Sequence, residues 1–582
     1  MKVFGANITC SVIDFLGRSK KLSLGDINEK IKSVSGIAAF FQKQDEFDKL
    51  IKTISAGENL LNEPDRSEYG DFQTNKDLSG EICDLLRKNN INPEIIIEPA
   101  CGKGNFIISS LQTFSNIKYI YGIEIFKPYV WEAKFQILDY FLNNPDAIPP
   151  EINIFHHNIF DFNLKTIAEK HKEQTVLILG NPPWVTNSKL SALGSNNLPP
   201  KSNFKKHTGI DAITGKGNFD IAEYISLKLI DVFSEFNGHF AFLMKNSVAK
   251  NILQEQKKVN YRISNIKQYN IDAKKEFNVS VNACLFLCTF NNRGENTINE
   301  YDFYSGKMIN KYGWYGNKFV ANIALYQQSK QIDGKFPFEW RQGLKHDASK
   351  VMELEKRNGH YLNNIKETVD LEEDLVFGLL KSSDLKGGVI DKPRKFTIVT
   401  QTKTGQSTDY IKHKYPKTYE YLSKNIDFFT KRKSTIYKGK PAFSIFGIGD
   451  YSFKPFKVAI SGMYKTTLFS LVKPYNNKPV MLDDTCYFIG FDTLMEAEIT
   501  RFLLNKNTSQ NFIQSIAFKD AKRMITKDLL MRIDLKKVME ETHFEELRTV
   551  FEHLTIGAWF DYQESIMKIH STINMQLNLF ET

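Results

Sequence analysis

Residues 176–184 (Val-Leu-Ile-Leu-Gly-Asn-Pro-Pro-Trp) place an amide, two prolines and an indole directly after an apolar run. Pro182 and Pro183 fix the backbone φ angle and lack an N–H donor, so the turn is stiff and its carbonyl oxygens point in preset directions. The side-chain oxygen of Asn181 and the carbonyl oxygen of Pro182 can each accept one hydrogen of an aromatic amino group. Such bonds draw the nitrogen towards tetrahedral geometry and expose its lone pair to an electrophilic methyl group, without an ionised base. The ring of Trp184 offers a flat face for stacking a base. A rigid surface turn is the alternative explanation.

A second segment, residues 95–106 (Ile-Ile-Ile-Glu-Pro-Ala-Cys-Gly-Lys-Gly-Asn-Phe), runs from an apolar strand through an acid into a glycine-rich turn. Gly102 and Gly104 would let the backbone approach a ligand closely. The turn lacks the spacing of the pyrophosphate and P-loop motifs, so a nucleotide phosphate is not the expected ligand. Glu98 can accept from an ammonium group, and Glu124, at the end of the next predicted strand, suits ribose hydroxyls. An amino acid and a ribose without a phosphate describe S-adenosyl-L-methionine, which we expect as cofactor; an ordinary turn between strand and helix is the alternative.

These motifs, in this order, resemble those of the amino-methylating DNA methyltransferases in which the cofactor turn, the Asn-Pro-Pro-aromatic motif and a target recognition domain follow one another, a gamma-like order. The resemblance covers residues 70–290 well and the remainder only in layout. The leading Asn, rather than Ser, favours adenine N6 over cytosine N4. The resemblance implies transfer of a methyl group from S-adenosyl-L-methionine to an adenine flipped out of double-stranded DNA. It also implies that no metal is required and that the chain is the modification enzyme of a restriction-modification system.

The resemblance also implies roles for individual residues. Expected cofactor contacts are Thr74, Glu98, Pro99, Ala100, Cys101, Gly102, Gly104, Glu124, Asn158 and Pro183. Thr74 belongs to residues 70–75, which are similar to the family's segment that closes over the methionine part. Asn158 stands where the family usually has Asp beside the cofactor adenine, and Asp161 is the alternative counterpart. Phe277 resembles an aromatic that stacks the flipped base together with Trp184, but it could equally be a core residue.

Two further segments are candidates for contact with DNA. The polar stretch between Trp184 and Asp220 is unusually long for a loop, and we interpret it as a lid or a backbone contact, with a plain linker as the alternative. In the C-terminal part, cations are interleaved with aromatic residues, a pattern suited to phosphate contacts and base reading. The DNA-binding residues predicted there are Lys431, Arg432, Lys433, Lys438 and Lys440.

The elements that must position these residues follow from apolar periodicity. Short apolar runs alternate with amphipathic helical stretches from about residue 70 to 290, which indicates an α/β, Rossmann-like domain with a mainly parallel sheet. The runs are residues 95–97, 117–123, 151–155, 176–179, 239–244, 266–269 and 281–290. Beyond about residue 330 we predict a C-terminal α+β target recognition domain, with strands near 397–399, 457–461, 467–472 and 486–489 and a helical end from 540. The expected domains are therefore 1–65 (helical), 66–330 (catalytic) and 331–582 (target recognition).

Composition is compatible with this interpretation. The chain has 582 residues, 42% hydrophobic and 25% charged, with a formal net charge of +10 that permits a polyanionic partner. Its six cysteines form no metal-ligand or disulfide pattern, and its longest apolar runs are too short to span a membrane. We therefore expect a soluble cytoplasmic protein, with any cognate restriction endonuclease encoded separately. Two alternatives remain open: methylation of guanine N2 in RNA or of glutamine in protein, and a non-catalytic DNA-binding module on the same fold.

Overall fold

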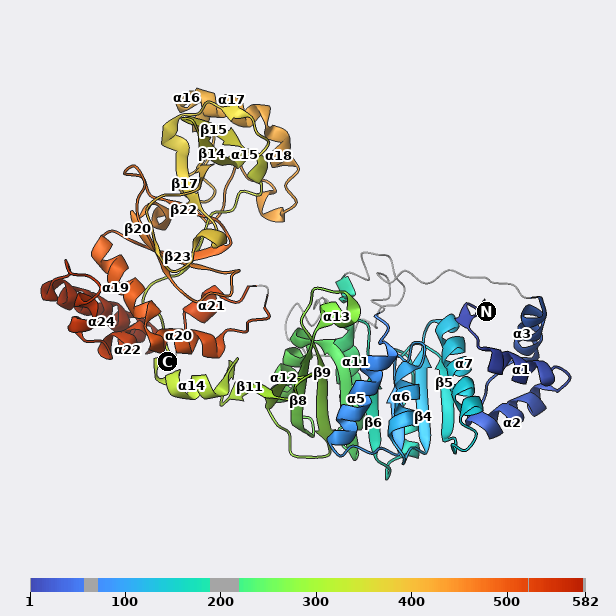
Figure 1. Cartoon of the computed structure of the whole chain (residues 1–582). Helices are drawn as coiled ribbons and strands as arrows, with labels where there is room; N and C mark the ends of the chain where they lie inside the picture. The colour runs from blue at the N-terminus through green and yellow to red at the C-terminus, as the bar shows by residue number, and fades with distance from the viewer. Residues whose placement is uncertain (1, 57–71, 189–218, 522, 579–582) are drawn as a thin grey trace. The chain divides into compact units, whose positions relative to one another are not determined.

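The computed structural model describes residues 2–56, 72–188, 219–521 and 523–578 (Figure 1). The chain divides into two compact units, Met1–Phe319 and Val320–Thr582. Within the described ranges, no helix combines the length and the apolar character needed to cross a membrane.

Unit 1 is built on a ten-stranded sheet of order β12-β11-β10-β8-β9-β7-β6-β3-β4-β5. The strands β5, β4, β3, β6 and β7 are parallel neighbours, and β9 runs antiparallel between β7 and β8. Every strand predicted before residue 290 is present, which confirms the α/β class with a mainly parallel core. The strands are β3 (Ile95–Glu98), β4 (Tyr119–Glu124), β5 (Glu151–His156), β6 (Val176–Gly180), β7 (Gly238–Lys245), β8 (Ile263–Ile271), β9 (Ala283–Phe290), β10 (Thr297–Asp302), β11 (Met308–Tyr315) and β12 (Lys318–Val320).

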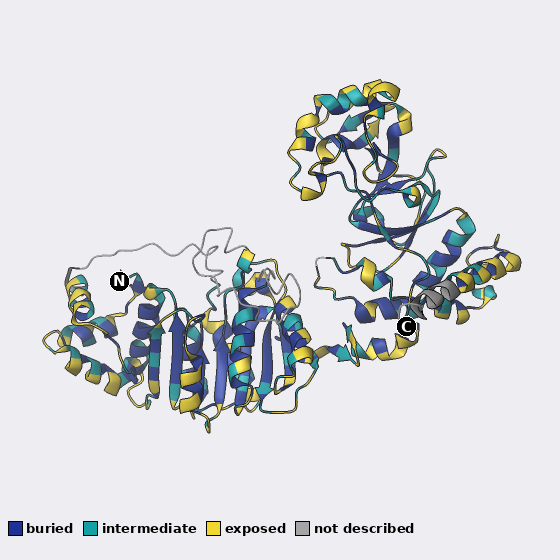
Figure 2. Cartoon of the chain, turned by 180° about the vertical axis from the view of Figure 1, so that it is seen from behind, coloured by how far each residue is buried: buried dark blue, intermediate teal, exposed yellow. Residues whose placement is uncertain are grey.

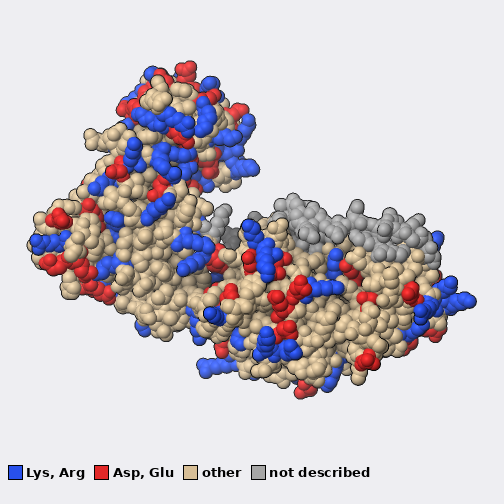
Figure 3. Space-filling model, viewed as in Figure 1, with Lys and Arg blue, Asp and Glu red and all other residues tan. Residues whose placement is uncertain are grey.

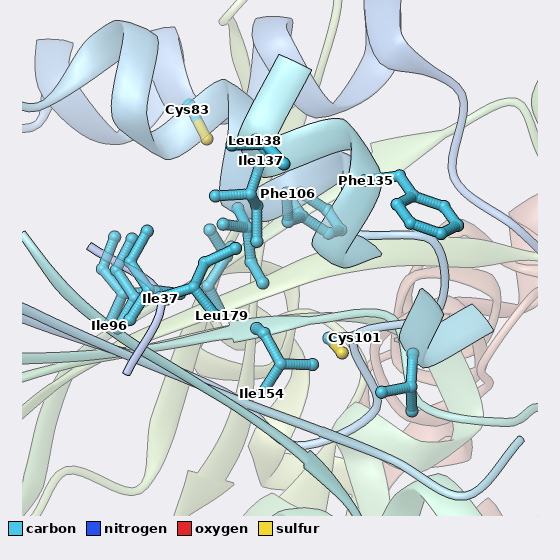
Figure 4. Close-up of a cluster of buried hydrophobic side chains, with 14 of the residues drawn as sticks. Ile37, Cys83, Ile96, Cys101, Phe106, Phe135, Ile137, Leu138, Ile154 and Leu179 are labelled. Atoms are coloured by element: carbon cyan, nitrogen blue, oxygen red, sulfur yellow. The ribbon is translucent and has the colours of Figure 1, made fainter. Parts of the chain in front are cut away.

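Strands β3 and β6 are buried along their whole length, because helices cover both faces of this sheet (Figure 2). The helices are α5 (Lys76–Lys88), α6 (Asn105–Thr113), α7 (Lys127–Asn143), α8 (Leu164–Lys170), α11 (Ile221–Phe233), α12 (Asn246–Val259) and α13 (Ala273–Phe277). Figure 4 shows how Ile96 and Leu179 of the central strands meet Phe106 of α6 and Ile137 and Leu138 of α7 in one apolar cluster. Burial of this kind stabilises a fold by about 25 cal/mol per Å² of apolar surface, so the sheet is a rigid platform for the loops at its edge.

The N-terminal segment packs on the same core. It comprises β1 (Lys2–Val3), β2 (Ala6–Asn7), α1 (Cys10–Arg18), α2 (Leu24–Ser35) and α3 (Gln44–Ala56). The side chain of Lys134 on α7 is buried and donates hydrogen bonds to the carbonyl oxygens of Ala39 (3.0 Å) and Phe40 (2.7 Å). Burial lowers the pKa of this lysine to about 8. Lys134 therefore holds the N-terminal helices against α7.

Unit 2 contains a six-stranded sheet of order β16-β15-β14-β19-β17-β22 and a five-stranded sheet of order β13-β23-β20-β21-β18. Its strands are β13 (Arg341–Gln342), β14 (Glu353–Arg357), β15 (His360–Asn363), β16 (Thr368–Val369), β17 (Val376–Leu380), β18 (Val389–Ile390), β19 (Lys395–Ile398), β20 (Phe456–Ser461), β21 (Ser470–Val472), β22 (Met481–Leu482) and β23 (Cys486–Phe491). Its helices are α14 (Ile323–Ser329), α15 (Ser349–Met352), α16 (Tyr410–Lys414), α17 (Pro416–Lys424), α18 (Ile426–Thr430), α19 (Leu494–Asn505), α20 (Asn507–Ile516), α21 (Lys527–Leu530), α22 (Leu535–Glu540), α23 (Phe544–Arg548) and α24 (Ile556–Asn578). Runs of strands (β13–β19 and β20–β23) are followed by runs of helices (α16–α18 and α19–α24), which is typical of an α+β unit.

Lys134→Ala should destabilise the docking of the N-terminal helices by about 2 to 3 kcal/mol, because the carbonyl oxygens of Ala39 and Phe40 lose a charged donor. Hydrogen exchange of peptides from α1 to α3, followed by mass spectrometry, measures this change. Lys127→Ala is the control, since Lys127 lies on the same helix but its pair with Glu46 is half exposed. Equal protection in the two variants would contradict the structural role of Lys134.

Candidate active site

A pocket lies at the carboxyl ends of β3, β4, β5 and β6, where an open α/β sheet usually binds ligands. Of the residues predicted from the sequence, the pocket is lined by Thr74, Glu98, Pro99, Ala100, Cys101, Gly102, Glu124, Asn158, Asn181 and Pro183. Gly104, Pro182, Trp184 and Phe277 are not part of the lining. The structure thus brings together side chains that lie more than a hundred positions apart in the sequence.

The glycine-rich turn after β3 depends on two left-handed residues. Gly102 has a φ angle of 52° and Gly104 one of 86°, a region that residues with a Cβ seldom adopt. A Cβ on Gly102 would lie 2.6 Å from Oε1 of Gln73, and one on Gly104 would lie 3.1 Å from the Cβ of Ala133. Gly104 also forms the N-cap of α6. The two glycines therefore keep a cradle that any side chain would fill or strain.

Two carboxylates lie next to this turn in different states. Oε2 of Glu98 is buried and has no hydrogen-bond partner among the described residues. Burial and the nearby charge of Glu124 raise the pKa of Glu98 well above its usual range. The carboxylate of Glu124, in contrast, accepts from the backbone N–H groups of Gly102 (2.9 Å) and Phe126 (2.7 Å). Glu98 fits an ammonium group, which would supply its missing donor and counter-charge, while Glu124 is oriented towards a second part of a ligand.

The lining of the pocket also includes Asn158, Ile125, Phe126 and Phe160. Oδ1 of Asn158 accepts from the backbone N–H of Phe160 (3.0 Å), which fixes the orientation of the amide. Asp161, the alternative to Asn158, is exposed and does not line the pocket. Apolar side chains beside one oriented amide suit a planar heterocycle such as adenine. The donor set of the whole pocket therefore fits S-adenosyl-L-methionine.

The catalytic turn predicted from the sequence follows β6 directly. The side-chain NH2 of Asn181 donates to the carbonyl oxygen of Phe72 (2.6 Å) and to Oγ1 of Thr74 (3.2 Å). Oδ1 of Asn181 is buried and has no partner within the part of the chain that the structure describes. Because both amide hydrogens are used, Oδ1 is left as an acceptor for an incoming donor.

An aromatic cluster adjoins this turn. The indole of Trp184 is only 5% exposed and donates its N–H to the carbonyl oxygen of Leu243 (3.3 Å). Its ring centroid lies 5.0 Å from that of Phe277 and 5.6 Å from that of Phe72. The ring of Trp184 is therefore enclosed by the cluster and does not present an open face. Its buried N–H needs an acceptor, and β7 provides one. The rings of Phe72 and Phe277 remain half-buried.

The sequence analysis missed the residues that hold these pieces together. The side chain of Asn105 donates to the carbonyl oxygen of Thr74 (2.7 Å), and Oε1 of Gln73 accepts from the N–H of Lys103 (3.4 Å). Asn105 and Gln73 stand inside the motifs but were not assigned roles, since only the folded chain reveals that the two segments touch. In the sequence, only their position within the two motifs could have indicated these roles.

The lid predicted after Trp184 lies mostly outside the described residues, which omit 189–218. What the structure describes is the base of this segment. The backbone N–H of Ile221 donates to the carbonyl oxygen of Val185 (2.9 Å), and Thr186 pairs with Asp220 as an isolated bridge. Nζ of Lys245, at the end of β7, lies 2.6 Å from Oδ2 of Asp220. The two ends of the segment are thus held together beside the pocket.

Unit 2 contains the predicted DNA-binding residues. Residues 401–440 contain ten Lys or Arg and three Asp or Glu, and blue side chains gather on the lobe that carries α16, α17 and α18 (Figure 3). Lys431, Lys433, Lys438 and Lys440 are exposed. Arg432 differs, because its guanidinium donates to the carbonyl oxygens of Phe429, Ser444 and His346 and covers the ring of Tyr437 at 3.7 Å. Arg432 therefore stabilises the lobe from inside.

Comparison with known proteins agrees with this geometry. No family model matches the chain. A Type II methyltransferase, M.NspV from Nostoc sp., is 38% identical over 478 residues, which cover 81% of this chain and 98% of that protein. Among solved structures, the Type IIL restriction-modification enzyme MmeI in complex with DNA matches with a TM-score of 0.52 and 14% identity, covering 97% of this chain and 78% of that one. At that identity, the second comparison shows the fold alone.

Binding of S-adenosyl-L-methionine should release protons. Its ammonium group lowers the raised pKa of Glu98, so the affinity should fall as the pH decreases through that pKa and the carboxyl becomes protonated. Calorimetry in buffers of different ionisation enthalpy measures the protons released. Glu98→Gln should bind about 10- to 100-fold more weakly and should lose the proton release. Equal release by both proteins would show that Glu98 is not the ammonium partner.

Proposed function

The chain belongs to the Type II methyltransferases, and on that premise we propose that it transfers a methyl group from S-adenosyl-L-methionine to N6 of an adenine in duplex DNA. The chain is a DNA methyltransferase of restriction-modification type that uses S-adenosyl-L-methionine; the adenine specificity and the extrusion of the base are the proposal. The proposed enzyme would protect the recognition sites of a separately encoded endonuclease.

The observation that carries the proposal is the unpartnered oxygen of Asn181. Its amide nitrogen is held by Phe72 and Thr74, so Oδ1 is presented to the pocket as a fixed acceptor. Together with the carbonyl oxygen of Pro182, it would accept the two hydrogens of an adenine amino group. The amide of Asn181 is oriented before the substrate arrives, so little reorganisation of this acceptor is needed when positive charge develops on the nitrogen.

The bound cofactor supplies the electrophilic methyl group. Around it, the chain's residues bind and orient: Glu98 would pair with the ammonium, Glu124 would bind the ribose, and Asn158 would contact the adenine of the cofactor. The half-buried rings of Phe72 and Phe277 beside the catalytic turn support stacking of an extruded base there, which offsets the few kcal/mol (about 2 to 4) lost on unstacking. No step assigned to these residues requires a metal.

The net positive charge of residues 401–440 supports contact with the DNA backbone. A protein that neutralises several phosphates releases the same number of counter-ions, which makes its binding strongly dependent on salt. Exposed lysines in unit 2 would set the register of the duplex, while polar side chains of the same unit read base edges.

Asn181→Ala should lower kcat by about 1,000-fold, because the amino group loses a fixed acceptor in the transition state. Affinity for DNA and for the cofactor should change by less than about 3-fold, since phosphate contacts dominate the affinity for DNA and other residues bind the cofactor. Single-turnover methylation of duplex DNA and equilibrium binding measure the two quantities. Near-normal turnover would reject the acceptor mechanism.

Lys431→Ala/Lys433→Ala should weaken DNA binding and reduce the slope of log Kd against log salt by about 1 for every phosphate that the variant no longer neutralises. Arg432 is left unchanged because its removal would disturb the lobe. Lys165→Ala/Lys172→Ala is a matched control, as it removes two exposed lysines of unit 1. If the two variants have the same slope as the unchanged protein, Lys431 and Lys433 do not contact the DNA backbone.

The substrate class is tested by parallel assays with duplex DNA, ribosomal RNA and a glutamine-containing peptide. Methyl transfer to DNA, followed by sequencing of modified bases, should yield N6-methyladenine at a defined site. RNA guanine and peptide glutamine are included because their planar nitrogens suit the same pair of acceptors. Methyl transfer to either of them and not to DNA would overturn the proposal. Binding of cofactor without transfer to any of the three would identify a non-catalytic module.

A further inference from the structure

Lys103 stands between the two glycines of the glycine-rich turn, yet its side chain does not line the cofactor pocket. It lines a separate polar groove, together with Glu132 and Gln136 of α7 and Asn7 of the N-terminal segment. Asn105 lines both cavities, so they adjoin at the turn. S-adenosyl-L-methionine carries an ammonium and a sulfonium charge, and a lysine amine directed into the pocket would repel both.

The backbone of Lys103 is held at both of its peptide groups. Its N–H donates to Oε1 of Gln73 (3.4 Å), and its carbonyl oxygen accepts from Nε2 of Gln136 (2.9 Å). The second bond holds the peptide that joins Lys103 to Gly104, the left-handed N-cap of α6. Because a glycine can adopt many backbone conformations, this peptide needs an external contact to keep a single orientation.

The side chain of Lys103 is held by the same helix. Its Nζ lies 3.6 Å from Oε1 of Glu132 and 5.3 Å from the ring centroid of Tyr129. Oε1 of Glu132 also accepts from Nδ2 of Asn7 (3.1 Å). Glu132 and Gln136 are one turn of α7 apart and therefore lie on the same face. Contacts from α7 thus keep both the backbone and the amine of Lys103 in place beside the groove.

The amide of Gln136 makes its contact under an unfavourable condition. Oε1 of Gln136 is buried and has no hydrogen-bond partner within the described ranges. A buried acceptor without a donor destabilises a fold, and natural proteins contain few of them. Rotation of the amide would not relieve this, because Oε1 would then face the carbonyl oxygen of Lys103, acceptor against acceptor. An unfavourable group retained beside a ligand pocket indicates a role in function.

We propose that Gln136 is a positioning residue for cofactor binding, whose amide fixes the peptide between Lys103 and Gly104 and thereby the shape of the glycine-rich turn. Gln136 acts from outside, since it does not line the pocket. The inference rests on the proposed function only in assigning this pocket to S-adenosyl-L-methionine, and not on the base that is methylated. It extends the cofactor site to α7, the helix to which Lys134 attaches the N-terminal segment.

The test replaces Gln136 by leucine, which has a similar volume but neither the donor nor the unpartnered oxygen. By calorimetry, Gln136→Leu should raise the Kd of S-adenosyl-L-methionine by about 10-fold, because the turn loses its fixed orientation. The midpoint of thermal unfolding of the ligand-free protein should change by less than about 2 °C, since the lost hydrogen bond and the removed unpartnered oxygen offset each other. A glutamine with a purely structural role would give the opposite result, a lower midpoint with an unchanged Kd, and would overturn the inference.

Gln112→Leu is the matched control, since Gln112 is an exposed glutamine on α6 that lines the same groove. Its Kd should stay within about 2-fold of that of the unchanged protein. Hydrogen exchange in residues 99–108 should be faster in Gln136→Leu, with exchange in α7 unchanged. An equal loss of affinity in Gln112→Leu, or faster exchange throughout α7, would also overturn the inference. Because no DNA is present, methylation of RNA or a peptide in place of DNA would reject the adenine proposal and leave this test unaffected.

Discussion

The two hydrogen bonds that hold the side-chain nitrogen of Asn181 are the interaction on which the rest of the site depends. An amide can present either an acceptor or a donor, and only the acceptor is useful to an incoming amino group. By using both hydrogens, Phe72 and Thr74 leave the oxygen as the group of this side chain that can still take a hydrogen-bond partner. The stiffness of the following prolines would be of little value without this choice, because a rigid turn with a rotated amide would repel the amino hydrogens of the proposed adenine substrate.

A second feature that prepares the pocket for its ligand is the unfavourable burial of the carboxyl group of Glu98. A buried carboxylate oxygen without a donor is costly, and Glu98 is in that state with Glu124 nearby. The cost is tolerated because β3 is enclosed on both faces by the apolar core, which fixes the backbone at Glu98. A cationic ligand relieves this unfavourable free energy when it binds, and that relief contributes to the affinity for the ligand. Glu124 differs because backbone N–H groups already satisfy its oxygens.

The basic lobe of unit 2 illustrates that neighbouring charges can have unrelated roles. Lys431 and Lys433 extend into solvent, while Arg432 between them turns inward to carbonyl oxygens and an aromatic ring. A guanidinium has five donors in a rigid plane and is less strongly hydrated than an ammonium, so it is the cation best suited to such an internal position. In the sequence the three residues form one uniform run.

The sequence by itself determined the class of the fold, the seven strands β3 to β9 of the ten-stranded sheet, and the two motifs at its edge. These features are local: a strand buried on both faces is a continuous apolar run, and a glycine or proline restricts its own backbone. Which side chains meet was decided by the tertiary structure alone. The parallel strands β3 and β6 bring residues 98 and 181 to one edge, and the segment at residues 72–74 reaches both only after its helix α5 has packed beside α6. Likewise, the inward position of Trp184 depends on an acceptor from β7, and the choice of Asn158 over Asp161 depends on which side chain faces the pocket. Such contacts depend on distances between residues far apart in the chain, about which the pattern of residue types within one segment carries no information.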